Sequence, residues 1–177
     1  MAGSRRSWGW HRLHPRWAER LVAESGIGRG DLVVDIGAGF GAITAPLVAT
    51  GATVIAVERH AQRAAELRAR FGRDVVVVMA DAGDLRLPRR PFHVVANPPF
   101  AATSAVLRRL LHPSSALVSA RLVLDERAIA RWAGRAAPAA GRWQRQFEIV
   151  IGERLPRNAF DPPPAVRCRV FSLDRRA

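Results

Sequence analysis

The sequence has no lysine and a single cysteine, and it contains no long apolar run. One cysteine, Cys168, excludes an internal disulfide bond and does not suffice for a zinc site with the scattered histidines, so no metal site is predicted. No stretch approaches the roughly 18 apolar residues of a membrane-spanning helix. Charged residues interrupt every apolar run within residues 1–30, which leaves no signal-peptide core. We therefore expect a cytoplasmic protein with no membrane association.

The charge is strongly positive and is carried by arginine alone. There are 28 basic residues against 15 acidic ones, which gives a formal net charge of +13. The bias toward arginine, together with abundant alanine, is typical of a genome rich in G and C. It still has a physical consequence, because guanidinium groups bind phosphates in a forked geometry and stack on unpaired bases. The composition therefore predicts a polyanionic partner.

Arginine and aromatic residues are interleaved near the start of the chain. This mixture suits single-stranded or looped nucleic acid, because bases stack on the rings while arginines neutralise the phosphates. The alternative is a solvated tail with no binding role. The residues predicted to bind RNA are Arg5, Arg6, Trp8, Trp10 and Arg12.

Length and strand composition indicate an α/β fold with one catalytic domain. A chain of 177 residues suits one domain, and its nearly continuous apolar strands are typical of a parallel sheet covered on both faces. We expect a basic, tryptophan-rich N-terminal segment with the first helix at 1–30, a catalytic domain at 31–177, and no separate C-terminal domain. The expected strands are 32–36, 53–57, 75–79, 94–96, 116–124, 147–155 and 166–173. The expected helices are 15–25, 42–50, 60–71, 103–111 and 125–133. The last two strands are expected to pair antiparallel, and 134–146 is expected to be a mobile basic loop.

The tetrapeptide Asn97-Pro98-Pro99-Phe100 follows a short apolar strand and is the most informative motif. The exocyclic amine of adenine is a poor nucleophile unless hydrogen-bond acceptors draw on its protons. The Asn97 side-chain oxygen and the Pro98 carbonyl are candidate acceptors. Successive prolines stiffen the loop, and Phe100 offers a face for stacking an extruded base. The alternative is an ordinary proline-rich turn after a strand.

A second motif, Gly37-Ala38-Gly39-Phe40-Gly41, joins a predicted buried strand to a predicted helix. Glycines let the backbone approach a cofactor closely, and the helix N-terminus presents free amides. Gly37 and Gly39 are therefore candidate cofactor contacts. The spacing is G-x-G-x-G, whereas the dinucleotide fingerprint is G-x-G-x-x-G, which disfavours a nicotinamide enzyme.

Two acidic residues follow the next two predicted strands. Glu58 is placed to accept hydrogen bonds from both ribose hydroxyls of an adenosyl group, and Asp81 from its adenine amine. Taken singly, Glu58 has the alternative of a solvated strand-end charge, and Asp81 would be interpreted as a turn aspartate. Together with the glycine turn and Asn97, they fall at four successive strand ends, the edge where open parallel sheets bind ligands. This pattern predicts a methyl-transferring enzyme that uses S-adenosylmethionine.

Five ordered motifs resemble those of the ribosomal RNA adenine N6-methyltransferases, and most closely the Erm type. The resemblance covers nearly all of the chain. It implies a class I S-adenosylmethionine-dependent methyltransferase (Rossmann-like) with a seven-stranded, mostly parallel sheet and helices on both faces. It also implies methylation of one adenine in the peptidyl-transferase region of 23S rRNA, with resistance to macrolides, lincosamides and streptogramin B. The motifs are Asp35-Ile36-Gly37-Ala38-Gly39-Phe40-Gly41, Val57-Glu58, Asp81-Ala82, Asn97-Pro98-Pro99-Phe100 and Phe160-Asp161-Pro162-Pro163-Pro164-Ala165-Val166.

The resemblance also assigns roles to individual residues. Asn97, Pro98 and Phe100 would serve the target base. This chain has Trp10-His11-Arg12-Leu13 where the family usually has Gln-Asn-Phe-Leu. Most relatives continue into a small helical C-terminal domain, whereas this chain stops after the last expected strand, so it is expected to be a short form. We also expect a monomer without an obligate protein partner. The implied cofactor-binding residues are His11, Leu13, Gly37, Gly39, Glu58, Asp81 and Asn97.

Other functions remain open at this point. The chain could be a small-subunit rRNA dimethyladenosine transferase, or a non-catalytic RNA-binding assembly factor on the same fold. The Asn-Pro-Pro-Phe motif also occurs in DNA adenine, rRNA guanine and protein glutamine methyltransferases, so it does not name the acceptor by itself. A DNA enzyme would normally need a recognition domain, and a protein substrate fits poorly with a net charge of +13.

Overall fold

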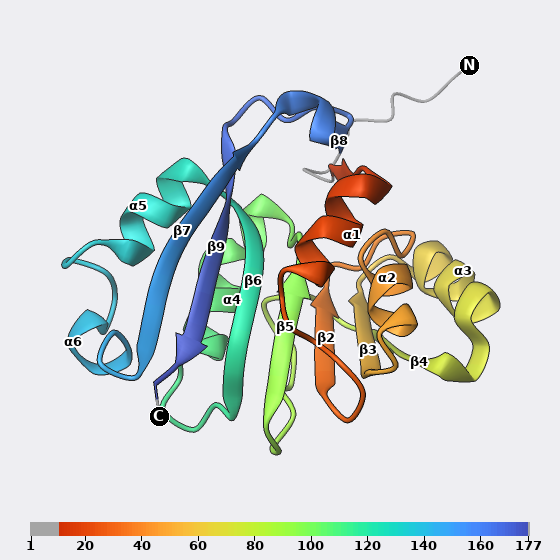
Figure 1. Ribbon diagram of the computed structural model, residues 1–177, viewed down its shortest axis with the longest axis horizontal. Helices are drawn as coiled ribbons and strands as arrows, with labels where there is room; N and C mark the ends of the chain where they lie inside the picture. The colour runs from red at the N-terminus through yellow and green to blue at the C-terminus, as the bar shows by residue number, and fades with distance from the viewer. Residues whose placement is uncertain (1–10, 177) are drawn as a thin grey trace.

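The computed structural model describes residues 11–176, and its centre is a seven-stranded sheet (Figure 1). The strand order is β4-β3-β2-β5-β6-β9-β7, and only β9 runs opposite to the other six strands. The predicted seven-stranded, mostly parallel sheet is therefore confirmed, as is the antiparallel pairing of the last two predicted strands. The strands are β2 (Leu32–Ile36), β3 (Thr53–Glu58), β4 (Val75–Met79), β5 (Phe92–Ala96), β6 (Leu117–Asp125), β7 (Phe147–Leu155) and β9 (Cys168–Arg175).

Helices cover both faces of this sheet, as predicted. Successive residues of a strand point to opposite faces, so Val33 joins one core cluster and Val34 the other. The first cluster also takes apolar residues from α1, α2 and α3, and the second takes them from α4, α5 and α6. The helices are α1 (Pro15–Ala23), α2 (Thr44–Ala49), α3 (Ala61–Phe71), α4 (Thr103–Leu110), α5 (Glu126–Ala133) and α6 (Ala140–Trp143). Short 3₁₀ turns are η1 (Gly72–Asp74), η2 (Phe100–Ala102) and η3 (Arg157–Ala159).

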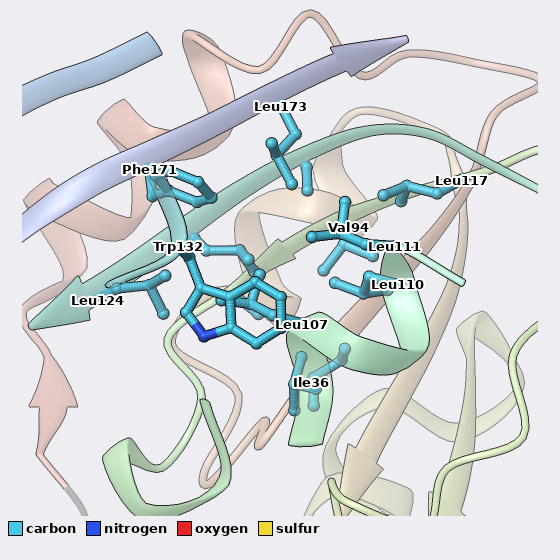
Figure 2. Packing of buried hydrophobic residues seen from close by; sticks show 14 of the residues in the cluster. Ile36, Val94, Leu107, Leu110, Leu111, Leu117, Leu124, Trp132, Phe171 and Leu173 are labelled. Atoms are coloured by element: carbon cyan, nitrogen blue, oxygen red, sulfur yellow. The ribbon is translucent and has the colours of Figure 1, made fainter. Parts of the chain in front are cut away.

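The core around Trp132 fixes α5 against the sheet. Figure 2 shows the indole of Trp132 among Leu107, Leu124 and Phe171, from α4, β6 and β9. Trp132 is 1% exposed, and a buried aromatic side chain of this size removes roughly 150–250 Å² from water. The end of β6 and the start of α5 are thereby held in a fixed position relative to α4.

The segment between α5 and β7 departs from expectation. We predicted a mobile loop at 134–146 because its composition is rich in alanine, glycine, proline and arginine. This prediction was wrong, because residues 140–143 form α6 and Trp143 is 2% exposed. The indole nitrogen of Trp143 donates to the Pro138 carbonyl at 3.0 Å, and its ring lies 6.4 Å from that of Trp132. A single buried tryptophan thus orders a segment whose average composition is that of a loop.

A second, two-stranded sheet was not predicted at all. β1 (Arg12–Leu13) pairs antiparallel with β8 (Phe160–Asp161), which brings the start of the described chain against the connection between β7 and β9. The backbone of His14 adds a hydrogen bond to the carbonyl of Ala159 at 2.7 Å.

No helix within residues 11–176 has the length and apolarity needed to cross a membrane.

Candidate active site

The carboxyl ends of four parallel strands bring the predicted site residues to one edge of the sheet. β2, β3, β4 and β5 are neighbours in the order β4-β3-β2-β5 and run in the same direction. Gly37 directly follows β2, Glu58 ends β3, and Asp81 and Asn97 lie just beyond β4 and β5. This is the edge at which open α/β sheets bind ligands. The upper ends of β2, β3 and β5 in Figure 1 mark it.

The glycine turn leaves β2 in a conformation that side chains disfavour. Gly37 and Gly39 have φ values of +79° and +58°. The amide of Gly37 donates to the carbonyl of Val57 at 2.8 Å, which fastens the turn to β3. A Cβ atom on Gly37 would lie 2.8 Å from Cδ of Pro99, closer than real Cβ contacts come. The turn and the Asn-Pro-Pro-Phe loop therefore touch, and only glycine permits it.

Glu58 is a buried carboxylate that organises the same turn. Its side chain accepts from the amide of Gly39 through Oε2 and from the amide of His60 through Oε1, each at 2.8 Å. A guanidinium nitrogen of Arg63 lies 4.0 Å from Oε1. The residue is 5% exposed, so the alternative of a solvated strand-end charge is excluded. Each oxygen has a further lone pair, and the carboxylate therefore suits a pair of hydroxyl donors.

Asp81 is more open and is held by its own turn. Its Oδ1 accepts from the amide of Gly83 at 2.8 Å, and its Oδ2 accepts from Arg59 at 3.2 Å. The Gly83 hydrogen bond first, and then the Arg59 guanidinium, keep the pKa of the Asp81 carboxyl below its ordinary value. The turn-aspartate interpretation therefore describes its local structure correctly. An ionised carboxylate at this point remains a suitable acceptor for an amine.

The side-chain nitrogen of Asn97 forms a hydrogen bond, whereas its side-chain oxygen forms none within residues 11–176. Its Nδ2 donates to the backbone carbonyl of His11 at 2.7 Å. Within residues 11–176, Oδ1 has no hydrogen-bond partner, so the bond to His11 orients the amide with a vacant acceptor. Pro98 is buried, and η2 begins at Phe100. The loop thus presents an oxygen at the sheet edge on a backbone with little freedom.

The N-terminal strand completes this side of the site. The ring of His11 stacks on Phe100 with centroids 5.5 Å apart, and its Nδ1 lies 2.7 Å from the carbonyl of Pro162. Leu13 is 2% exposed and its side chain belongs to the core. Arg12 forms an exposed ion pair with Asp161 at 3.2 Å. Four residues predicted to bind RNA lie outside the described residues: Arg5, Arg6, Trp8 and Trp10.

A small hollow joins β1, the glycine turn and the Asn-Pro-Pro-Phe loop. Glu58 and Asp81 are not in its lining, although Glu58 holds the Gly39 amide that forms part of the turn. A much larger groove of about 750 Å³ lies elsewhere, across the face of β2, β3 and β4, and contains none of the predicted site residues. The lining of the small hollow is His11, Arg12, Leu13, Asp35, Gly37, Ala38, Phe40, Ala42, Ile43 and Asn97.

Asp35 is a member of this hollow that the sequence prediction did not assign to the site. It is 1% exposed, and its Oδ2 accepts from the hydroxyl of Thr44 at 2.7 Å. Burial raises the pKa of the Asp35 carboxyl to about 7, against the effect of the Thr44 hydrogen bond and with a smaller contribution from Glu58. The signal in the sequence was one acidic residue inside an otherwise apolar strand.

Comparison with known proteins gives consistent matches. A family model described as ribosomal RNA adenine dimethylase matches residues 5–177. The chain is 37% identical over 146 residues to an rRNA adenine N-6-methyltransferase of Corynebacterium diphtheriae, covering 81% of this chain and 57% of the relative. It is 34% identical over 150 residues to the mycinamicin-resistance protein MyrB of Micromonospora griseorubida, covering 82% and 47%. The chain thus spans about half the length of these two relatives.

A solved structure agrees with these matches. The crystal structure of the 23S rRNA methyltransferase ErmE is similar with a TM-score of 0.81 and 25% identity, over 93% of this chain and 70% of that one. The resemblance that the motifs predicted is therefore confirmed at the level of family and fold.

We expect Gly37→Ala to lower the free energy of unfolding by roughly 1–3 kcal/mol, because the new methyl group meets Pro99 and the positive φ disfavours alanine. Gly28→Ala is the matched control, since a Cβ there has nothing within 4 Å, and it should change stability by less than about 1 kcal/mol. Urea denaturation measures both. Equal stabilities of the two variants would contradict the close approach of turn and loop.

We expect the stability of the wild type to fall between about pH 4 and pH 7 relative to that of Asp35→Asn. The pKa of Asp35 is raised from 3.8 to about 7, so in this window the native state keeps a proton that the unfolded state has released. The free energy of unfolding then decreases as pH rises, with a slope approaching about 1.4 kcal/mol per pH unit. Urea midpoints across this range provide the measurement. The exposed Asp74, changed to Asn, is the control. A constant difference between wild type and Asp35→Asn would refute the raised pKa.

Proposed function

The chain belongs to the ribosomal RNA adenine dimethylase family, and from this membership we propose that it transfers a methyl group from S-adenosylmethionine to N6 of an adenine in the peptidyl-transferase region of 23S rRNA. Such methylation would confer resistance to macrolides, lincosamides and streptogramin B. The observation that carries the proposal is the side-chain oxygen of Asn97, which has no hydrogen-bond partner within residues 11–176 and is oriented by His11 at the sheet edge beside the glycine turn.

The chemistry of the target amine explains why this acceptor matters. The N6 lone pair of adenine is delocalised into the ring, so attack on a methyl group requires the nitrogen to become more tetrahedral. Asn97 Oδ1 would accept one N–H and thereby favour that geometry as the bond forms. The carbonyl of Pro98 is the candidate for the second N–H. Phe100, already stacked on His11, would provide an aromatic surface against the extruded base.

The residues at the ends of β2, β3 and β4 fit an adenosyl cofactor. S-Adenosylmethionine supplies an electrophilic methyl group on a sulfonium. Glu58 would accept the ribose hydroxyls, because its carboxylate is buried, held by two backbone amides and still has vacant lone pairs. Asp81 would accept the adenine amine. The backbone of Gly37 and Gly39 would lie against the cofactor, in a turn whose positive φ values suit glycine.

Transfer of labelled methyl groups to rRNA tests the proposal directly. The purified chain is incubated with labelled S-adenosylmethionine and either 23S or 16S rRNA transcripts, and primer extension maps the modified nucleotide. We expect label in 23S rRNA at an adenine of the peptidyl-transferase region. Label confined to 16S rRNA would identify a small-subunit dimethyladenosine transferase, which the same family includes as an alternative. Binding of RNA without transfer of label would point instead to a non-catalytic assembly factor.

We expect Asn97→Ala to lower the rate of methyl transfer by roughly 100-fold to 1,000-fold, because one preorganised polar contact to the reacting amine is lost. Affinity for S-adenosylhomocysteine, measured by calorimetry, should change little. Asn158→Ala is the matched control, because Asn158 is exposed and lies in η3. A rate for Asn97→Ala within about threefold of wild type would exclude the proposed role of the amide.

We expect Glu58→Ala to weaken S-adenosylhomocysteine binding by about 1.5–3 kcal/mol, since hydrogen bonds to a charged acceptor are lost. Glu58→Gln retains an acceptor for the Gly39 amide, so it separates the loss of the carboxylate from local unfolding of the turn. The exposed Glu66, changed to Ala, is the control. If calorimetry gives wild-type affinity for both Glu58 variants, the carboxylate does not bind the cofactor.

A further inference from the structure

Residues 126–146 carry five arginines. All five side chains belong to exposed residues, and none forms an ion pair within the described part of the chain. By contrast, Arg12, Arg20, Arg121 and Arg154 are each paired with a carboxylate. We call the unpaired set the arginine platform. Its members are Arg127, Arg131, Arg135, Arg142 and Arg145.

The two acidic residues at the start of the platform are engaged elsewhere, and the next acidic residue along the chain is Glu148 in β7. Asp125 caps α5, and its Oδ1 accepts from the amides of Arg127 and Ala128. Glu126 pairs with Arg154 at 2.8 Å and with Arg167 at 2.9 Å. No other carboxylate occurs between residues 126 and 146. The platform is therefore a local concentration of positive charge rather than a solvated mixture of both signs.

The platform has a rigid base. Trp132 and Trp143 are 1% and 2% exposed and contact one another, which joins α5 to α6. The side chain of Gln144 closes the segment by donating to the carbonyl of Gly134 at 3.1 Å. Arginines on an ordered backbone lose less conformational entropy when they bind than arginines on a mobile loop would. The order of this segment, which its composition did not predict, is thus relevant to binding.

The platform begins at the same edge of the sheet as Asn97. α5 follows β6 without a gap, and β6 lies parallel and next to β5, which leads into Asn97. In Figure 1, α5 lies near the upper end of the sheet and α6 lies below it along the flank formed by β7. A polyanion with one nucleotide at Asn97 would reach Arg127 first and then follow the flank toward α6.

We propose that the arginine platform binds the phosphate backbone of the RNA segment that flanks the target adenine. This inference rests on the proposed function and adds the path of the substrate to it. Guanidinium groups form paired hydrogen bonds with phosphates, and spaced arginines along an ordered surface match the repeated charge of a nucleic acid strand. The connection between β4 and β5 also carries arginines without an ion pair within residues 11–176, namely Arg86, Arg89 and Arg90, and these serve as the comparison.

Two triple variants with the same change in net charge test the proposal. The first removes Arg127, Arg131 and Arg135 by substitution with alanine. The second removes Arg86, Arg89 and Arg90, which are exposed, have no ion pair within residues 11–176, and line the groove across β2, β3 and β4. Fluorescence titration measures the affinity of each for a 23S rRNA hairpin at several salt concentrations. Calorimetry with S-adenosylhomocysteine and circular dichroism check the site and the fold.

Each lost phosphate contact flattens the log-log dependence of affinity on salt by about 0.7, so the platform variant should lose about 2 in slope. The comparison variant should keep nearly the wild-type slope, and both should bind S-adenosylhomocysteine as wild type does. Substitution of the three platform residues by lysine should preserve most of the slope. Equal slopes for the two alanine variants would overturn the proposal, because RNA would then respond only to net charge. Absence of methyl transfer to 23S rRNA by the wild type would instead refute the proposed function.

Discussion

The contact between the glycine turn and the Asn-Pro-Pro-Phe loop determines the geometry of the site. Gly37 has no Cβ, and Pro99 occupies the space that a Cβ would need. β2 and β5 are adjacent, so this contact sets how far the turn at the end of one strand lies from the amide at the end of the other. The carbonyl of His11 then fixes the Asn97 amide. The glycine turn is thus in van der Waals contact with the Asn-Pro-Pro-Phe loop, and the loop is fixed to His11 by one hydrogen bond.

Two buried carboxyl groups beneath this contact have opposite environments. Glu58 accepts hydrogen bonds from the backbone amides of Gly39 and His60. Asp35 has one hydroxyl donor and a pKa raised to about 7, so it is largely protonated below neutral pH. Glu58 and the more exposed Asp81 are therefore the carboxyl groups that accept backbone amides at the ends of β3 and β4. Donors from a neutral, hydroxyl-bearing ligand group would meet acceptors there.

Most of the sheet could be predicted from the sequence because its strands are continuous apolar runs bounded by turn residues. The strand predicted at 32–36 coincides with β2, and that at 75–79 with β4. Local sequence could not predict the β1–β8 pairing, because Arg12 and Asp161 are 149 residues apart in the chain. It also missed α6, because the segment has the composition of a loop although the buried Trp143 orders it. For Glu58, the residue type was informative, but only burial excluded a solvated surface charge.

The arginines that give the net charge of +13 fall into two groups: those bonded to other groups of the protein and those that are not. Arg121 is paired with Asp174, and Arg175 packs on Phe147 and donates to the carbonyls of Leu117 and Ser115, so both stabilise the antiparallel end of the sheet. Arginines of this kind have their donors committed to the protein and retain few for a ligand. The arginines available to a polyanion are those left without carboxylate or carbonyl partners. The surface open to a polyanion is therefore defined by which arginines the fold leaves without partners, and composition alone does not show which these are.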